Sequence, residues 1–222
     1  MKLLCITDLH GRSSTLQDII TDAGRVDVIL LGGDITDFDT PNAAEQLVRL
    51  AQEQCDAVLA VAGNCDSAAI DDRLVELGVS LFGRGVQRSD IGFYGVSAMP
   101  PWTGNMYELS EEEIAAALRR GYDQTRGTSR QVMLAHPPPR DTGLDRVHNG
   151  RHVGSVSVRD AIEKQRPALV ACGHIHESRG IERIGPTTIV NCGPAFRGNY
   201  AVAEIEAQPD SRIDVQLRGI ER

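Results

Sequence analysis

Five short apolar runs of the sequence each end at, or within a few residues of, an Asp, Asn or His side chain. The runs are Leu3–Thr7, Val26–Leu31, Ala57–Ala62, Val132–Ala135 and Ala168–Cys172. Each has the length and composition of a buried strand, and helical patterns lie between most of them. This alternation predicts an α/β fold with parallel strands, and it constrains the chain more than any other feature.

Several helix starts can be located from their capping residues. Ser14-x-x-Gln17 and Ser110-x-x-Glu113 have the spacing of capping boxes, and Thr40-Pro41 provides an N-cap followed by a proline at the first helical position. Residues 79–98 and the chain from Gly180 onward alternate in short runs, which predicts antiparallel strands. No repeat or linker composition interrupts the pattern, so residues 1–222 are expected to form one domain.

The polar residues that follow the apolar runs are of the types that bind metal ions. They are Asp8, His10, Asp34, Asn64, His136, His174 and His176. Ligands of open α/β sheets gather outside the carboxyl ends of the strands, so these side chains are expected to converge. Imidazoles mixed with carboxylate and amide oxygens suit manganese, iron, zinc, cobalt or nickel better than calcium or magnesium alone. Seven ligands exceed the needs of one ion and match a two-metal hydrolytic site.

The same residues give the sequence a resemblance to a known family. The blocks Asp8-Leu9-His10, Gly32-Gly33-Asp34, Gly63-Asn64-Cys65-Asp66, His136 and Gly173-His174-Ile175-His176 resemble the calcineurin-like metallophosphoesterases. The chain looks most like the small prokaryotic branch related to the cyclic-nucleotide phosphodiesterases. The resemblance implies a four-layer α/β/β/α sandwich of two mixed sheets flanked by helices.

The resemblance also implies a division of the ligands between two divalent ions. One ion would be held by Asp8, His10, Asp34 and His176, and the other by Asp34, Asn64, His136 and His174. A hydroxide bridging the ions would attack phosphorus in line, and manganese is the first expectation for the metal. The expected substrate is a small phosphate ester, with a phosphodiester preferred. A phosphomonoesterase or nucleotide pyrophosphohydrolase is the alternative enzyme, and a non-catalytic protein-binding scaffold of the same fold is the alternative of another class.

Cys65 is a departure from the family pattern, because many members carry His after the Gly-Asn pair. A thiol is a weak hydrogen-bond donor and a poor substitute for an imidazolium, so we expect Cys65 not to restore full general-acid catalysis. Asp66 is expected to cap the following helix or orient its neighbours, with a catalytic role as the alternative. His148 and His152, on the long loop 137–156, are candidate donors to the leaving group.

The charge balance and the cysteines limit the partners and the compartment. The chain has 31 Asp and Glu against 23 Lys and Arg, a net charge of −8, which argues against long nucleic acids and anionic membranes as partners. No apolar run approaches the ~20 residues of a membrane span. The five cysteines are odd in number and scattered, which favours a reducing cytoplasm. A homodimer is left open.

Trp102 is the single tryptophan of the chain and follows Pro100-Pro101. We expect it to anchor the packing of this loop rather than to provide a platform on which a ring stacks.

Overall fold

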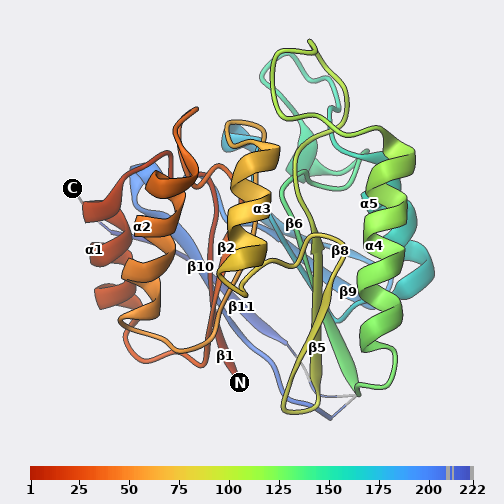
Figure 1. Ribbon diagram of the computed structural model, residues 1–222. Helices are drawn as coiled ribbons and strands as arrows, with labels where there is room; N and C mark the ends of the chain where they lie inside the picture. The colour runs from red at the N-terminus through yellow and green to blue at the C-terminus, as the bar shows by residue number, and fades with distance from the viewer. Residues whose placement is uncertain (209–210, 212, 221–222) are drawn as a thin grey trace.

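The computed structural model describes residues 1–208, 211 and 213–220, and in these residues two β-sheets lie between layers of helices (Figure 1). The first sheet has the strand order β11-β10-β1-β2-β3. Its strands are β1 (Lys2–Ile6), β2 (Val28–Gly32), β3 (Val58–Val61), β10 (Asn199–Glu204) and β11 (Asp214–Gly219). Strands β1, β2 and β3 are parallel, and β10 and β11 extend the sheet with antiparallel pairs.

The second sheet has the strand order β4-β5-β6-β7-β9-β8. Its strands are β4 (Gly85–Arg88), β5 (Ile91–Val96), β6 (Arg130–Ala135), β7 (Leu169–Cys172), β8 (Gly180–Ile184) and β9 (Thr187–Asn191). The four central strands β5, β6, β7 and β9 are parallel, and the edge strands β4 and β8 pair antiparallel with their neighbours. Both sheets are therefore mixed.

Helices cover the outer face of each sheet. Figure 1 shows α1 (Ser13–Ala23), α2 (Pro41–Gln52) and α3 (Ala68–Glu76) on the side of the first sheet, and α4 (Glu111–Thr125) and α5 (Val156–Gln165) on the side of the second. Short 3-10 helices occupy Gly143–Asp145, His176–Ser178 and Ala195–Arg197. None of the helices in the described part of the chain combines the length and the apolar composition of a membrane span.

The alternation of buried side chains along the strands separates three apolar cores. On β1, Leu4 and Ile6 pack against the helices of the first sheet, whereas Leu3 and Cys5 face the second sheet. On β7, Leu169 faces the first sheet and Val170 packs toward α4 and α5. Because successive residues of a strand point to opposite faces, a sheet buried on both sides needs apolar residues at every position. Three cores define four layers, which confirms the α/β/β/α sandwich.

Most of the predicted helix starts are confirmed, and one is wrong. Thr40 caps α2 through the backbone N–H of Ala43, and Ser110 forms a complete capping box with Glu113 at the start of α4. The capping box predicted at Ser14 does not form, because α1 begins at Ser13 and its N-cap is Arg12, which makes no side-chain cap. The loop that precedes α1 is fixed instead by backbone pairing with the next loop, which the capping rule does not consider.

Candidate metal centre

The ends of the parallel strands bring the predicted ligands to one edge of the molecule. Asp8 and His10 follow β1, Asp34 follows β2, and His136 follows β6. Asn64 likewise follows β3, and the remaining two histidines follow β7. Backbone hydrogen bonds join the first two loops, from the N–H of Asp8 to the carbonyl of Gly33 (3.0 Å) and from that of His10 to Asp34 (2.9 Å). The convergence predicted from the sequence is therefore present.

Four of these residues have backbone conformations that L-amino acids rarely adopt. The φ angles are +57° at Asp8, +47° at His10, +47° at Asp34 and +66° at His174. Left-handed backbone at a residue other than glycine costs free energy and persists only where the surrounding structure imposes it. Such strain concentrates at functional sites, and here it turns each of the four side chains toward the shared edge.

Two glycines provide the space that this arrangement needs. A Cβ atom at Gly33 would lie 2.4 Å from Nδ1 of His136, and one at Gly63 would lie 2.1 Å from the backbone nitrogen of Asp34. Both distances are far below van der Waals contact, so any side chain there would displace a predicted ligand. The glycines of these sequence blocks therefore allow the backbone to pack closely around Asp34 and His136.

The carboxylate of Asp34 lies between two histidines. Its Oδ2 is 3.6 Å from Nε2 of His10, and its Oδ1 is 3.6 Å from Nε2 of His136. Oδ1 also accepts a hydrogen bond from the backbone N–H of Cys65 at 2.7 Å, which fixes the orientation of the carboxylate. Asp34 is 2% exposed, so this geometry is held within the protein interior.

A second carboxylate, that of Asp8, lies on the side of the predicted ligands that is more exposed to solvent. These predicted ligands are called the cluster below. Its Oδ1 lies 3.4 Å from Nε2 of His176, and its oxygens accept the backbone N–H of His174 at 3.0 and 3.2 Å. The rings of His10 and His176 meet edge to face with centroids 5.6 Å apart. These two histidines are partly exposed, so this side can be reached from solvent.

On the buried side, two hydrogen-bond acceptors face each other. Nδ1 of His136 lies 2.9 Å from the carbonyl oxygen of Gly32, which can only accept, so in the neutral ring the proton resides on Nδ1. Nε2 then carries a lone pair, and it lies 2.8 Å from Oδ1 of Asn64, which also carries lone pairs. Without a proton between them the two atoms repel each other, and a cation bound to both would remove the repulsion.

The protonation states favour ligation at neutral pH. Burial alone would raise the pKa of Asp8, but the hydrogen bond from His176 is the largest opposing effect, and the pKa is lowered to about 2. Burial lowers the pKa of His174 to about 3. Burial, reinforced by the carboxylates of Asp8 and Asp66, raises the pKa of Asp34. A charged Asp8 and a neutral His174 are the forms that bind metals.

The donor set fits a pair of divalent ions. Ligand atoms of Asp8, His10 and His176 lie within 4.8 Å of one another, as do those of Asp8, Asp34 and His136, and those of His10, Asp34 and Cys65. Among the described residues, Nε2 of His10 is a buried polar atom that makes no hydrogen bond. Buried polar atoms are normally satisfied, so this one calls for an additional partner. The ring of His174, tilted against that of His136 at 5.1 Å, borders the same space.

A family model described as the calcineurin-like phosphoesterase superfamily domain matches residues 1–208. The chain belongs to this superfamily. It is 35% identical over 200 residues to the uncharacterized protein MJ1162 of Methanocaldococcus jannaschii, an alignment that covers 87% of this chain and 88% of the relative.

Solved structures share the fold of this phosphoesterase-superfamily chain. The protein TT1561 of Thermus thermophilus has a TM-score of 0.74 at 17% identity over 98% of each chain. A dimetal phosphatase from Danio rerio has a TM-score of 0.66 at 14% identity, covering 99% of this chain and 96% of the other. At these identities the likeness concerns the fold alone, and it confirms the fold class predicted from the sequence.

Cys65, which stands where many superfamily members have histidine, lies beside the cluster. Its side chain is 8% exposed, and burial together with the charge of Asp34 raises the pKa of the thiol. The thiol is therefore neutral at pH 7 and carries no positive charge. The main contact that Cys65 makes to the cluster is through its backbone N–H, which orients Asp34.

Asp66 ties together the loops that carry the ligands. It is 5% exposed and accepts hydrogen bonds from the backbone N–H groups of Ile35 (3.0 Å), Thr36 (2.9 Å) and Gly63 (2.8 Å). The cap of α3 is the neighbouring Ser67. These contacts match the expectation that Asp66 orients its neighbours, and its position beside the loop backbones suits that role.

The two histidines of the long loop have different surroundings. The side chain of His148 is 89% exposed, with Nε2 3.8 Å from Glu177. His152 lines a cavity of about 490 Å³ beside the centre, and its Nδ1 is 2.6 Å from Oδ1 of the buried Asp145. Asp145 also accepts the backbone N–H groups of Thr142 and Gly154, so it organises the loop that carries His152.

Two further residues contact the cluster and were not predicted. Oδ1 of Asp37 lies 3.5 Å from Nδ1 of His10 and can fix the orientation of that ring. The ring of Phe196 meets both His10 (5.3 Å) and His176 (5.4 Å) edge to face. The position of Asp37 three residues after Asp34 is a signal that could have been used. Phe196 reaches the site only through the tertiary fold.

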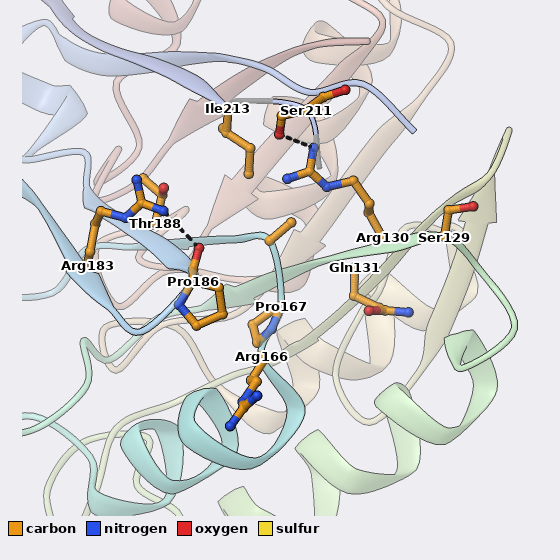
Figure 2. A pocket seen from close by; sticks show the side chains of 11 residues that line it. Ser129, Arg130, Gln131, Arg166, Pro167, Arg183, Pro186, Thr188, Ser211 and Ile213 are labelled. Atoms are coloured by element: carbon orange, nitrogen blue, oxygen red, sulfur yellow. Dashed lines mark hydrogen bonds between the residues drawn. The ribbon is translucent and has the colours of Figure 1, made fainter. Parts of the chain in front are cut away.

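A second cavity, of about 420 Å³, lies at the opposite ends of the same strands (Figure 2). It is lined by arginines and by the residues that start β6, β7 and β9. Figure 2 shows Arg130 donating to the backbone carbonyl of Ser211 (3.0 Å) and Arg183 to that of Pro186 (3.3 Å). Their positive charges thus serve contacts within the chain.

Proposed function

We propose that the chain is a phosphoesterase that depends on two divalent metal ions and prefers phosphodiesters. The observation that carries the proposal is the pair of facing acceptors, Nε2 of His136 and Oδ1 of Asn64, at 2.8 Å. With the proton of a neutral His136 held on Nδ1 by the carbonyl of Gly32, a cation shared by Nε2 and Oδ1 accounts for this geometry. Membership of the calcineurin-like phosphoesterase superfamily supports ester hydrolysis as the reaction.

The proposed ligands divide into two sets that share one carboxylate. Asp8, His10, Asp34 and His176 form the set on the open side, and Asp34, Asn64, His136 and His174 form the buried set. Asp34 is the shared residue because its two oxygens face different histidines. Imidazole nitrogens and hard oxygens in similar numbers make manganese the first metal to test, with iron, zinc, nickel and cobalt as alternatives.

The residues of the chain prepare the site before any substrate arrives. When bound, two divalent ions at such a site supply Lewis acidity toward the phosphoryl oxygens and lower the pKa of an attacking water. The carbonyl of Gly32 holds the Nδ1 proton of His136, which leaves Nε2 free to ligate. The carboxylate of Asp37 lies 3.5 Å from Nδ1 of His10, on the side of the ring away from Asp34. The backbone N–H of Cys65 fixes Asp34 in the shared position.

Two features support a diester rather than a monoester as the substrate. The raised pKa of Cys65 leaves a neutral thiol where an imidazolium would add charge, so the site has less positive charge for a dianionic monoester. The cavity of about 490 Å³ beside the centre has room for the second ester group. A diester carries a single negative charge and needs that additional space.

The test combines metal analysis with paired substrates. Protein purified with Mn²⁺ should hold two ions per chain and should hydrolyse bis(p-nitrophenyl) phosphate faster than p-nitrophenyl phosphate, which has the same leaving group. His136→Gln should lose at least one ion, whereas His148→Gln, the same change at an exposed histidine, should keep both. Fewer than two ions together with no hydrolysis of either ester would contradict the enzymatic proposal. Hydrolysis of the monoester alone would reverse the substrate preference.

A further inference from the structure

The cavity beside the candidate centre opens directly onto the proposed metal ligands. Asn64 and His174 belong to its lining, so a molecule bound there reaches the centre. Most of the rest of the wall comes from the loop after β5 and from the long loop after β6. It combines apolar side chains, such as Met99, Trp102 and Met106, with the charged Glu111, Arg140 and Arg151.

Trp102 and Met106 leave large apolar surfaces uncovered in this wall. Trp102 is 59% exposed and Met106 is 40% exposed, whereas most large apolar residues of the described chain are buried. The expectation that Trp102 anchors the packing of its loop is therefore wrong. Exposed apolar surface beside a polar site is typical of ligand binding.

The loop holds Trp102 in this exposed position by specific hydrogen bonds. The carboxylate of Glu108 accepts the backbone N–H groups of Trp102 (3.0 Å), Thr103 (3.0 Å) and Gly104 (2.9 Å). The backbone N–H of Tyr107 donates to the carbonyl of Asn64 at 3.1 Å, which ties the loop to the metal centre. The indole is thus presented by an ordered turn.

We propose that this cavity binds an aromatic ring carried by the phosphate ester that the centre hydrolyses. The proposal rests on the proposed function and names its substrate class. The guanidinium of Arg151 lies over the Trp102 ring, 5.6 Å from its centroid, so one face of the indole already makes a cation–π contact. The thioethers of Met99 and Met106 complete a wall that favours aromatic over saturated groups, since sulfur–ring contacts add to apolar burial.

The decisive comparison uses two probes of nearly equal size, phenylphosphonate and cyclohexylphosphonate. Both carry the same charged group and a carbon–phosphorus bond that the centre does not hydrolyse. Calorimetric titration of the Mn²⁺-loaded protein should give about 3–10-fold tighter binding for the phenyl compound, the usual gain from ring stacking beyond burial. Because Trp102 is the single tryptophan, phenylphosphonate should also change the intrinsic tryptophan fluorescence over the same concentration range.

Variants show whether the preference comes from Trp102. Trp102→Leu should bring the affinities of the two phosphonates to within about twofold, and the exposure of the residue predicts a folded protein with an unchanged melting temperature. Phe38→Leu is the matched control, since Phe38 is similarly exposed (61%) and lies outside the lining of this cavity. It should keep the preference of the wild type.

The outcomes separate this proposal from the proposed function. Equal binding of the two phosphonates by the wild type, or a preference that survives Trp102→Leu, would overturn the aromatic site even if both probes require Mn²⁺. Absence of any binding by the loaded protein would overturn it as well. A phenyl preference that is unchanged after Mn²⁺ is removed would support the ring site and contradict the role of the metals in holding the phosphonate.

Discussion

The parallel strands β6 and β7 have a cavity at each end, and the polar groups around the two cavities make different contacts. At the carboxyl end, the cavity of about 490 Å³ adjoins side chains whose lone pairs face each other, as at His136 and Asn64. At the amino end, the cavity of about 420 Å³ is lined by arginines that donate to carbonyls of the chain itself. The two cavities are similar in size, but they differ in the charged groups that line them and in the contacts of those groups.

The difference shows that charge alone does not identify a binding site. Arg130 is 8% exposed and donates to the carbonyls of Glu206 (3.1 Å) and Ser211 (3.0 Å), so its charge is compensated within the fold. At the other end, His10 has a buried nitrogen that makes no hydrogen bond, and Asp34 holds a left-handed backbone. The gathering of four left-handed residues among the predicted ligands distinguishes the carboxyl end, where the strain lies in the predicted ligands themselves.

The largest effect is expected from Asp34→Asn, which removes the shared carboxylate and keeps its size. The Mn²⁺ content should fall from two ions to one or none, and diester hydrolysis should fall roughly 10³-fold, because a metal contributes several kcal/mol and each ~1.4 kcal/mol is tenfold in rate. Metal analysis and steady-state rates check the prediction. Two retained ions with full activity would show that the carboxyl end is not the metal site.

The next largest effect is expected at Asp71, a buried carboxyl group on α3. Its hydrogen bonds do not fully offset the cost of burying its charged form. Burial raises its pKa to about 6, although hydrogen bonds from Ser97 and Tyr107 (both 2.8 Å) oppose the shift. A raised carboxyl pKa stabilises the fold below the unfolded pKa, and this stability is lost as the pH rises through the folded pKa. The loss over the whole titration is about 3 kcal/mol, at about 1.36 kcal/mol per pKa unit. About 2.4 kcal/mol of it falls between pH 4 and pH 7, because the carboxyl of the unfolded chain is already partly ionised at pH 4.

Urea unfolding of Asp71→Asn at pH 4 and pH 7 tests this slope. The asparagine does not titrate, so the free energy of unfolding of the wild type should fall relative to the variant as the pH rises. Asp72→Asn is the matched control, since Asp72 is the exposed neighbour on the same helix and should leave the slope unchanged. A parallel pH dependence of the wild type and Asp71→Asn would contradict the prediction.

Arg130→Met tests the cavity at the amino ends of β6 and β7. The change removes hydrogen bonds from a buried charge and should lower the free energy of unfolding by about 2 kcal/mol, in the range of hydrogen bonds to charged groups. Metal content and diester hydrolysis should stay at the level of the wild type. The exposed Arg88, changed to Met, controls for the loss of charge. A loss of hydrolysis in the folded Arg130 variant would mean that the two ends are coupled.

The ligand cluster could be predicted from the sequence because its causes are local. Each apolar run fixes a strand, and the residue that follows a parallel strand must lie at the carboxyl edge, whatever the rest of the chain does. The order of the five sequence blocks, which resembles that of the calcineurin-like metallophosphoesterases, then indicated the fold class. Asp8, Asp34 and His136 therefore fall where the sequence analysis expected them.

The remaining features depend on contacts that the sequence does not specify. Phe196 reaches the histidines from the loop after β9, far along the chain. His148 and His152 lie four residues apart in one loop, and the tertiary contacts of that loop, including the hydrogen bond between His152 and Asp145, place His152 in the cavity wall. Trp102 was expected to anchor the packing of its loop, whereas a turn held by Glu108 keeps it exposed.

The smallest effect is expected from Cys65→His, which tests whether protonation of the leaving group limits hydrolysis at the candidate metal centre. The thiol is neutral because burial and Asp34 raise its pKa, so the wild type should depend on the quality of the leaving group. An imidazole at this position can protonate an alkoxide, and general acids contribute about 10²-fold or more when well placed. In a space shaped for a thiol we expect about a tenfold gain for alkyl diesters relative to aryl diesters, measured as the ratio of kcat/KM. An unchanged ratio, in a variant that still binds two ions, would show that leaving-group protonation does not limit this site.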